Sequence, residues 1–222
     1  VASLNLVTGV LGELTLGHAG FMSVGAYASA ILTTQFFPAD SPALFPVALV
    51  AGGLAAALFG YLVGVPALRL KGDYLAIITL GFGEIIRVLI NTVFSPWTGG
   101  GKMLSNIPRY TTFANSFWIM AIALAVLFML AWSRHGRAII SIRENEVASD
   151  SSGVPVTSYK IRTFVISAFF AGIAGGLYAH YISVLDPAKF DFNKSIEYLV
   201  MVVFGGMGSF TGSVVAASGL TL

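Results

Sequence analysis

Apolar segments long enough to cross a membrane dominate this chain. A transmembrane helix needs about 20 predominantly apolar residues, and several segments reach or exceed that length. Only 10% of the residues are charged, whereas soluble domains carry about 25%, so we expect most of the chain to be surrounded by lipid. The sequence therefore predicts an all-α, polytopic membrane helix bundle. The apolar segments are residues 4–37, 44–68, 74–94, 113–132, 163–185 and 196–204, and a last one that starts at residue 213.

Two glycine-rich stretches interrupt the apolar pattern. The first segment is longer than one span and contains five spaced glycines, Gly9, Gly12, Gly17, Gly20 and Gly25. These glycines predict a broken helix or two short helical pieces. A second break is predicted over residues 205–212, which read GGMGSFTG. Irregular backbone at membrane depth is tolerated only inside protein or beside a water-filled cavity, so both breaks are candidates for a transport path. Two G-x-x-x-G pairs, at residues 60–64 and 172–176, predict helix packing within the chain.

The longest polar run, residues 132–162, separates two of the apolar segments. It holds five basic residues, Arg134, Arg137, Arg143, Lys160 and Arg162. Cytoplasmic loops of membrane proteins carry an excess of Lys and Arg, so we expect residues 133–162 to form a cytoplasmic loop. Counting spans back places Arg69 and Lys71 on the same side, which makes five plus two, or seven, basic residues there. Residues 38–42, 95–112 and 186–195 fall outside and hold four, Lys102, Arg109, Lys189 and Lys194.

A short helix is predicted inside the polar loop. The sequence Ser141-Ile-Arg-Glu144 fits a capping box that opens a helix, and Gly153 followed by Pro155 would close it after about three turns. A solvated connecting helix is the common outcome for such a segment. Its charge and its small residues would also suit insertion into a groove on a partner.

Glu84 and Arg87 are charged residues near the middle of an apolar segment. Their i, i+3 spacing puts them on one helix face, and charges at this depth are costly unless they are paired or face water. A self-neutralising structural ion pair is the favoured interpretation, because buried ions must be paired. A gate or a proton relay is the alternative.

Glu13 and His18 are ionisable residues in a glycine-rich apolar setting. Ionisable groups within membrane segments are functional suspects by default, and a helix that breaks here would expose backbone groups to a cavity, as in transporters with discontinuous helices. Tight helix packing with His18 hydrogen-bonded in the interior is an equally good interpretation.

Several chemistries lack support in the sequence. The chain has no cysteine, and a net charge of +2 is too small to argue for nucleic acid. His18, His135 and His180 lack metal-ligand spacing. Thr98-Gly-Gly-Gly-Lys102 lacks the spacing and the Ser/Thr of a phosphate loop, and no hydrolase motif is present. We therefore expect no enzyme activity, no metal and no cofactor bound by this chain.

Several motifs together resemble those of branched-chain amino acid ABC permeases. The stretch from Gly12 to Phe21, with Gly25-Ala-Tyr, is similar to their glycine-histidine signature, and residues 68–87 look like their M-type subunit. Thr98-Gly-Gly, Ile107-Pro108 and Val203-Phe-Gly-Gly-Met-Gly-Ser209 follow in the same order. Ala148-Ser149-x-x-x-Gly153 resembles the coupling motif of ABC importer permeases. The sequence departs from the family where Glu13 replaces the usual Gln, Met103 a common Gly, and Val147 an acidic residue.

The resemblance implies one transmembrane permease domain over residues 1–222, truncated at both ends, in a bacterial or archaeal inner membrane. It would pair with a related second permease, two cytoplasmic ATPases that use the ATP, and an extracytoplasmic binding protein. Implied substrates are branched-chain or other neutral amino acids, with urea or short amides as the alternative. An ion-coupled secondary transporter that uses Glu84, Arg87 and Glu13 is the competing mechanism. The candidate pathway residues are Gly12, Glu13, Thr15, Gly17, His18, Gly20, Gly25, Gly205, Gly206 and Gly208. The candidate ATPase-coupling residues are Arg137, Arg143, Glu144, Glu146, Ala148, Ser149 and Gly153.

Overall fold

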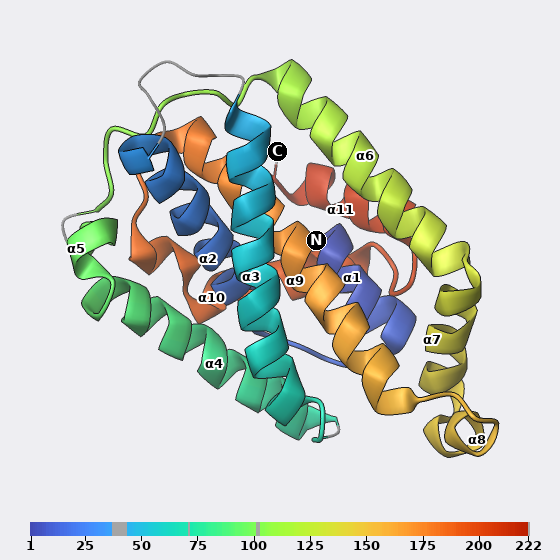
Figure 1. The fold of residues 1–222 in the computed structure, drawn as a ribbon. Coiled ribbons are helices and arrows are strands. Elements are labelled where there is room, and N and C mark those ends of the chain that lie inside the picture. The colour runs from blue at the N-terminus through green and yellow to red at the C-terminus, as the bar shows by residue number, and fades with distance from the viewer. Residues whose placement is uncertain (37–43, 71, 101–102, 222) are drawn as a thin grey trace.

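A computed structural model describes residues 1–36, 44–70, 72–100 and 103–221, and within these ranges the fold is helical with no strand (Figure 1). Lys71, Lys102 and residues 38–42, which entered the topology prediction, lie outside the described residues. The helices are α1 (Ala2–Asn5), η1 (Leu6–Leu11), α2 (His18–Ile31), η2 (Leu32–Phe36), α3 (Phe45–Ala67), α4 (Asp73–Thr92), α5 (Ser95–Thr98), α6 (Phe113–Trp132), α7 (Arg134–Glu144), α8 (Glu146–Ser151), α9 (Val156–Ile182), η5 (Pro187–Phe190), α10 (Phe192–Phe204) and α11 (Phe210–Thr221). The segments η1 and η2 are π-helical, and η5 is a 3₁₀ turn.

Four of the described helices are long and apolar enough to cross a membrane, namely α3, α4, α6 and α9. This agrees with the all-α polytopic bundle that the sequence predicts. The helix α9 begins at Val156, seven residues before the apolar segment that predicted it. The last residues of the predicted polar loop are therefore helical, and Lys160 lies on α9.

The helices α2, α3 and α9 pack together as the centre of the bundle (Figure 1). Glycines permit this close packing: a Cβ atom on Gly25 of α2 would lie 2.2 Å from the Cα atom of Gly172 on α9. Both G-x-x-x-G pairs contact other helices of the same chain, since Gly60 faces Ala168 and Gly172 faces Ala56. The predicted packing within the chain is confirmed.

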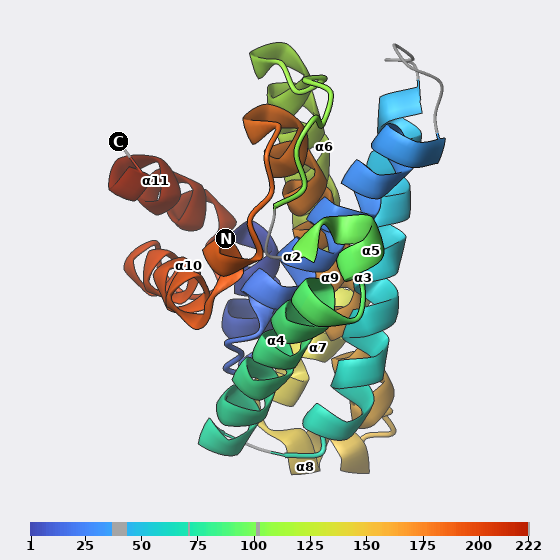
Figure 2. The same ribbon diagram turned by 90° about the vertical axis from the view of Figure 1, so that its left-hand side faces the viewer.

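The connections gather at two opposite ends of the bundle. The α3–α4 connection lies at the same end as α7 and α8 (Figures 1 and 2). At the other end, Leu104 and Leu185 exchange backbone hydrogen bonds of 3.0 and 2.8 Å, and the Arg109 Nε atom donates to Ser183 Oγ at 3.1 Å. The loops that the sequence predicts to share one side of the membrane therefore share one end of the molecule.

The polar loop holds two helices, so the prediction of a single helix opened by Ser141 is wrong. The N-cap of α7 is Ser133, whose Oγ atom accepts the Gly136 N–H at 3.2 Å. Ser141 lies inside α7, where its hydroxyl donates to the Ala138 carbonyl at 2.9 Å. The chain breaks at Asn145, whose extended backbone and side-chain acceptor for Ala148 N–H start α8. The predicted end is right, because Gly153 follows α8 with a left-handed φ of 83°.

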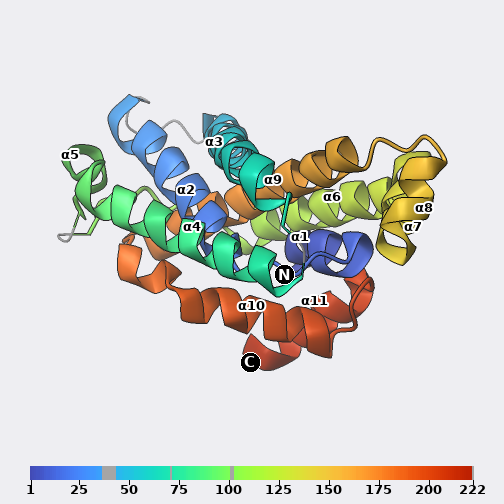
Figure 3. The same cartoon turned by 90° about the horizontal axis from the view of Figure 1, so that it is seen from below.

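Both predicted helix breaks are present. The helix η1 ends at Gly12, which has a φ of 82°, and the chain remains non-helical until α2 begins at His18. The helix α10 ends at Phe204, and Gly206 and Gly208 both have a φ of 88° before α11 begins at Phe210. Figures 2 and 3 show α10 and α11 as a layer on one side of the bundle, and α1 contacts α9 as well as both helices of this layer.

Candidate functional site

The helix η1, which leads into the first break, lies against the second break, and the buried side chain of Asn5 from α1 bonds to that second break. Its Oδ1 atom accepts the Gly208 N–H at 2.7 Å, and its Nδ2 atom donates to the Ser209 carbonyl at 2.8 Å and to Ser213 Oγ at 2.7 Å. A helix break leaves backbone donors and acceptors without their normal partners, and Asn5 supplies partners for two of them. We call residues 5–17 together with residues 205–209 the break junction.

A very close backbone approach holds the break junction together. A Cβ atom on Gly9 would lie 2.1 Å from the backbone nitrogen of Gly208 and 1.9 Å from Asn5 Oδ1. Real Cβ atoms do not come this close to backbone, so Gly9 must remain a glycine for the two segments to meet. The sequence marks Gly9 as one of several interrupting glycines, but its contact with Gly208 is visible only in the fold.

Arg143 of α7 extends from the polar loop into the break junction. Its Nη1 atom donates to the Gly9 carbonyl at 2.7 Å, and its Nη2 atom pairs with Glu144 Oε1, also at 2.7 Å. The aliphatic part of the side chain passes so close to Gly12 that a Cβ atom there would lie 2.4 Å from Arg143 Cγ. Gly12 is thus required both by its positive φ and by the passage of this arginine.

Lys160 of α9 makes a second connection between the polar loop and the first break. Its Nζ atom lies 2.6 Å from Glu13 Oε1 and 3.2 Å from Glu146 Oε1, the first residue of α8. The lysine side chain is only 4% exposed and that of Glu13 only 12%. Removing one partner of a buried ion pair costs about 3–5 kcal/mol, because the other charge is left unpaired.

His18 has one hydrogen-bonded and one unpaired ring nitrogen. Its Nε2 atom lies 2.7 Å from Ser167 Oγ, and Ser167 in turn donates to the Ser3 carbonyl. Its Nδ1 atom and the hydroxyl of Thr15 are buried and find no partner within the described residues. The interior packing predicted for His18 is therefore present on one side of the ring, while the other side is not satisfied by protein.

Other predicted pathway residues serve helix packing or turn geometry. Gly17 and Gly20 face Thr79 and Gly83 of α4. Gly25 packs against α9, as described above. Gly205 caps α10, and Gly206 forms the turn that follows it.

The predicted coupling residues divide between the surface and the interior. Glu144, Ala148 and Arg137 are exposed, and the Arg137 Nη1 atom donates to the Trp132 carbonyl at 3.5 Å. Ser149 is buried, and its hydroxyl bonds to Ser141 Oγ at 3.2 Å, which fastens α8 to α7. Arg143 and Glu146 reach the first break directly or through Lys160.

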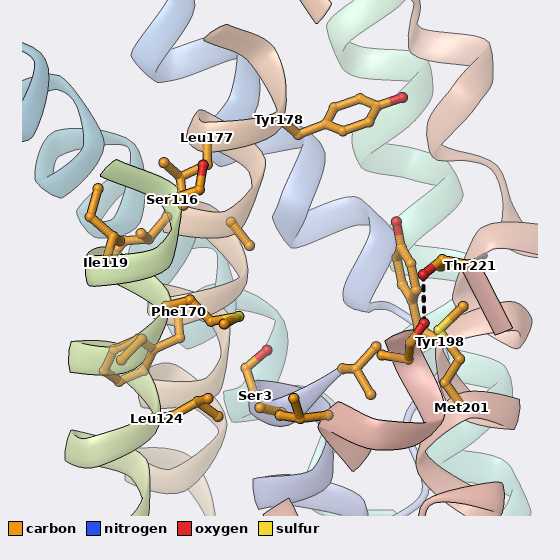
Figure 4. Close-up of a pocket in the computed structure, with 18 of the residues that line it drawn as sticks. Ser3, Ser116, Ile119, Leu124, Phe170, Leu177, Tyr178, Tyr198, Met201 and Thr221 are labelled. Carbon is orange, nitrogen blue, oxygen red and sulfur yellow. Dashed lines mark hydrogen bonds between the residues drawn. The ribbon is translucent and has the colours of Figure 1, made fainter. Parts of the chain in front are cut away.

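A cleft of about 860 Å³ lies away from the break junction. Figure 4 shows α6 and α9 along one side of it and α10 on the other. Its walls are mostly apolar, with tyrosines and the Lys194–Glu197 pair, whose charged atoms are 2.5 Å apart, as polar groups. None of the ten predicted pathway residues lines this cleft. The sequence analysis did not identify this cleft, because most of its wall residues lie in apolar segments that carry no motif.

A second cavity, of about 380 Å³, adjoins the break junction. Val10, Arg143, Gly208 and Ser209 contribute to its wall together with the end of α6. Gly208 is the one predicted pathway residue that lines it.

The Glu84–Arg87 pair forms as the spacing predicts. The Arg87 Nε and Nη2 atoms lie 2.8 and 2.7 Å from Glu84 Oε2, and both side chains are about one-third exposed. The positive charge of Arg87 also acts on the carboxyl group of Asp191, the residue that caps α10. The pKa of Asp191 lies below its usual range, mainly because the Asn193 side chain donates to its carboxylate, and Arg87 adds to this effect.

Comparison with known proteins shows which permeases the chain resembles. The chain is 38% identical over 250 residues to the high-affinity branched-chain amino acid transport system permease protein LivM of Salmonella typhimurium and to that of Escherichia coli. Each alignment covers 96% of this chain and 57% of the relative, so the chain spans little more than half the length of these proteins. It is also 27% identical to the nucleoside ABC transporter permease protein NupC of Lactococcus lactis, over 87% of this chain and 67% of the relative. No solved structure matches.

One family description matches almost the whole chain. It covers residues 1–221, which include both helix breaks, the polar loop with α7 and α8, and all four candidate membrane spans. The chain therefore belongs to the family described as the permease component of the branched-chain amino acid transport system.

Proposed function

We propose that this chain is the membrane-spanning part of a permease subunit in an ATP-driven importer of branched-chain or other neutral amino acids. Its partners in this proposal are a related second permease, two cytoplasmic ATPases and an extracytoplasmic binding protein. The family membership and the 38% identity to two permeases of this kind support the proposal. ATP would be hydrolysed by the partner ATPases, and this chain would bind no cofactor.

The observation that carries the proposal is the attachment of α7 and α8 to the first helix break. Arg143 contacts Gly9, and Lys160 joins Glu13 to Glu146. An ATPase that moved α7 and α8 would therefore also move residues 9–13, and Gly9 in this stretch lies against Gly208 of the second break. Such a movement is what alternating access requires, because the path must open on one side while it closes on the other.

The exposed surface of α6 is apolar, as expected for a helix that contacts lipid or another membrane subunit. Apart from Asn115 and Ser116 near its start, this 20-residue helix is apolar, yet only Leu127 and Ala131 in it are buried by the rest of the described chain. An apolar surface of this length would be unstable in water. We place it against lipid or against the second permease.

The charge pairs weigh against the ion-coupled alternative. Glu13 is paired with Lys160, and Glu84 with Arg87. Each of these carboxylates therefore has a cation of the same chain as its direct partner, which is the arrangement expected of structural ion pairs. The same pairs are compatible with a neutral or zwitterionic substrate, which needs no fixed charge in its path. Urea or a short amide is the alternative substrate within the same mechanism.

The test is uptake by the full-length protein reconstituted with its partner subunits in vesicles. We expect leucine uptake that requires ATP on the ATPase side and the binding protein on the other side, and that continues after an ionophore has removed ion gradients. Unlabelled isoleucine and valine should compete, whereas urea should not. Uptake that does not depend on ATP and is abolished by the ionophore would instead identify a secondary transporter. Competition by urea alone would change the substrate and keep the mechanism.

A further inference from the structure

Two cations of the polar region have the same two-sided arrangement. Lys160 lies between Glu13 in the first break and Glu146 on α8. Arg143 lies between the Gly9 carbonyl, in the helix η1 that leads into the first break, and the Glu144 carboxylate on its own helix. Each cation thus has one ligand in the break junction and one ligand on the α7–α8 pair.

The inner and outer ligands differ in their access to water. Glu13 is 12% exposed, whereas Glu146 is 33% and Glu144 is 67% exposed. Ion pairs with an exposed partner are weakened by solvent, whereas buried pairs are screened much less. The inner contacts should therefore persist while the outer contacts break and re-form as α7 and α8 move.

The inner ligands lie on both sides of one hinge-like residue. Gly9 and Glu13 flank Gly12, whose left-handed φ of 82° ends the helix η1. Glycine can cross between backbone regions that other residues cannot enter easily. A displacement passed through the two cations would act on the backbone on either side of this position.

We propose that Lys160 and Arg143 are positioning residues that transmit the displacement of α7 and α8 to the first helix break. In this proposal they contact neither the substrate nor ATP. Their role is to make the first break move together with α7 and α8. This inference rests on the proposed function and deepens it, because it names the residues through which ATPase movement would reach the path.

The first experiment removes an outer contact and leaves the buried pair intact. In the full-length protein assembled with its partners, Glu146→Ala is compared with Asp150→Ala, a matched change at an exposed acidic residue of the same helix. Coupling between distant sites is typically worth a factor of about 5–150. We expect Glu146→Ala to lower uptake about fivefold while the ATPases still co-purify and still hydrolyse ATP near the wild-type rate. Asp150→Ala should leave uptake and hydrolysis unchanged.

The second experiment removes the inner pair without leaving a buried charge. Lys160→Met combined with Glu13→Gln should uncouple uptake from hydrolysis in the same way. Adding Glu146→Ala to this double variant should cause no further loss, because its partner Lys160 is already absent. If Glu146→Ala lowers uptake by the same factor in the double variant as in the wild type, the residues do not act through one another. That result would overturn the proposal.

The outcomes separate the two proposals. If the wild-type assembly shows no ATP-driven uptake, the proposed function fails and the inference fails with it. If the wild type transports and Glu146→Ala transports equally well, the inference alone fails. A parallel loss of uptake and of ATPase co-purification in Glu146→Ala would also overturn it, because Glu146 would then serve as a contact for the ATPase.

Discussion

Replacing Asn5 with alanine should destabilise the protein strongly, because this one buried side chain from α1 satisfies two backbone groups of the second helix break. The change removes the acceptor for the Gly208 N–H and the donor for the Ser209 carbonyl, together with the bond to Ser213 Oγ. Each buried polar group left without a partner costs about 1–3 kcal/mol. The Ser213 hydroxyl can rotate towards a carbonyl of its own helix, so we count only the two backbone groups.

The expected loss is therefore about 2–6 kcal/mol of unfolding free energy, from two unsatisfied groups at about 1–3 kcal/mol each. It should be measured by denaturant titration of the purified protein in mixed micelles, with tryptophan fluorescence as the signal. Asn115→Ala is the matched control, because its side chain is exposed and donates a hydrogen bond of 3.3 Å to the Tyr110 carbonyl. A surface change of that kind should cost less than about 0.5 kcal/mol.

The result that would refute the reasoning is a small loss. If Asn5→Ala and Asn115→Ala destabilise the protein equally, the second break is not held to α1 through this amide. The close approach of Gly9 to Gly208 would then have to be maintained by packing alone.

Three further predictions concern other parts of the bundle. Gly25→Leu should lower stability by about 3 kcal/mol or prevent folding, because its side chain would enter the backbone of α9; the yield of monodisperse protein measures this. The double change Glu84→Gln with Arg87→Gln should alter stability by less than about 1 kcal/mol, as for other partly exposed pairs, and should leave uptake intact. Asp191→Ala should remove about 1 kcal/mol at neutral pH, because Asp191 caps α10. The pKa of this carboxyl is lowered by Asn193, so its contribution is present above the unfolded value of about 3.9 and fades as the pH falls through the lower folded value.

Each of these predictions has a clear contrary outcome. Normal yield and stability of Gly25→Leu would contradict the close helix contact. Loss of uptake in the Glu84 and Arg87 double variant, with stability retained, would favour a gating role for that pair. For Asp191→Ala, a difference from the wild type that stays constant between about pH 7 and pH 3 would show that the carboxylate charge does not contribute.

Features encoded by neighbouring residues could be predicted from the sequence. The apolar segments predicted the membrane-length helices, and the glycine-rich stretches predicted both breaks. The i, i+3 spacing predicted the Glu84–Arg87 pair. These predictions succeed because helix formation, helix termination and pairs on one helix face depend on residues within about one turn of each other.

The helix start inside the polar loop shows where local reasoning fails. Ser133 and Ser141 are both serines with the potential to cap, and the local pattern at Ser141 is the better match to a capping box. In the structure Ser133 caps α7, and Ser141 lies in its middle, where it also bonds to Ser149 of α8. The packing of α7 and α8 against the bundle decided between two locally acceptable starts.

By itself, the sequence determined that this chain forms broken membrane helices with a basic loop at one end. It did not determine that the first helical segment bonds to the second break, because Asn5 and Ser209 are 204 positions apart. Nor did it show that Lys160, one basic residue among five in the loop, is the buried cation between Glu13 and Glu146. Only the tertiary structure decides these contacts, because burial and pairing depend on which segments the packing of α2, α3 and α9 brings together.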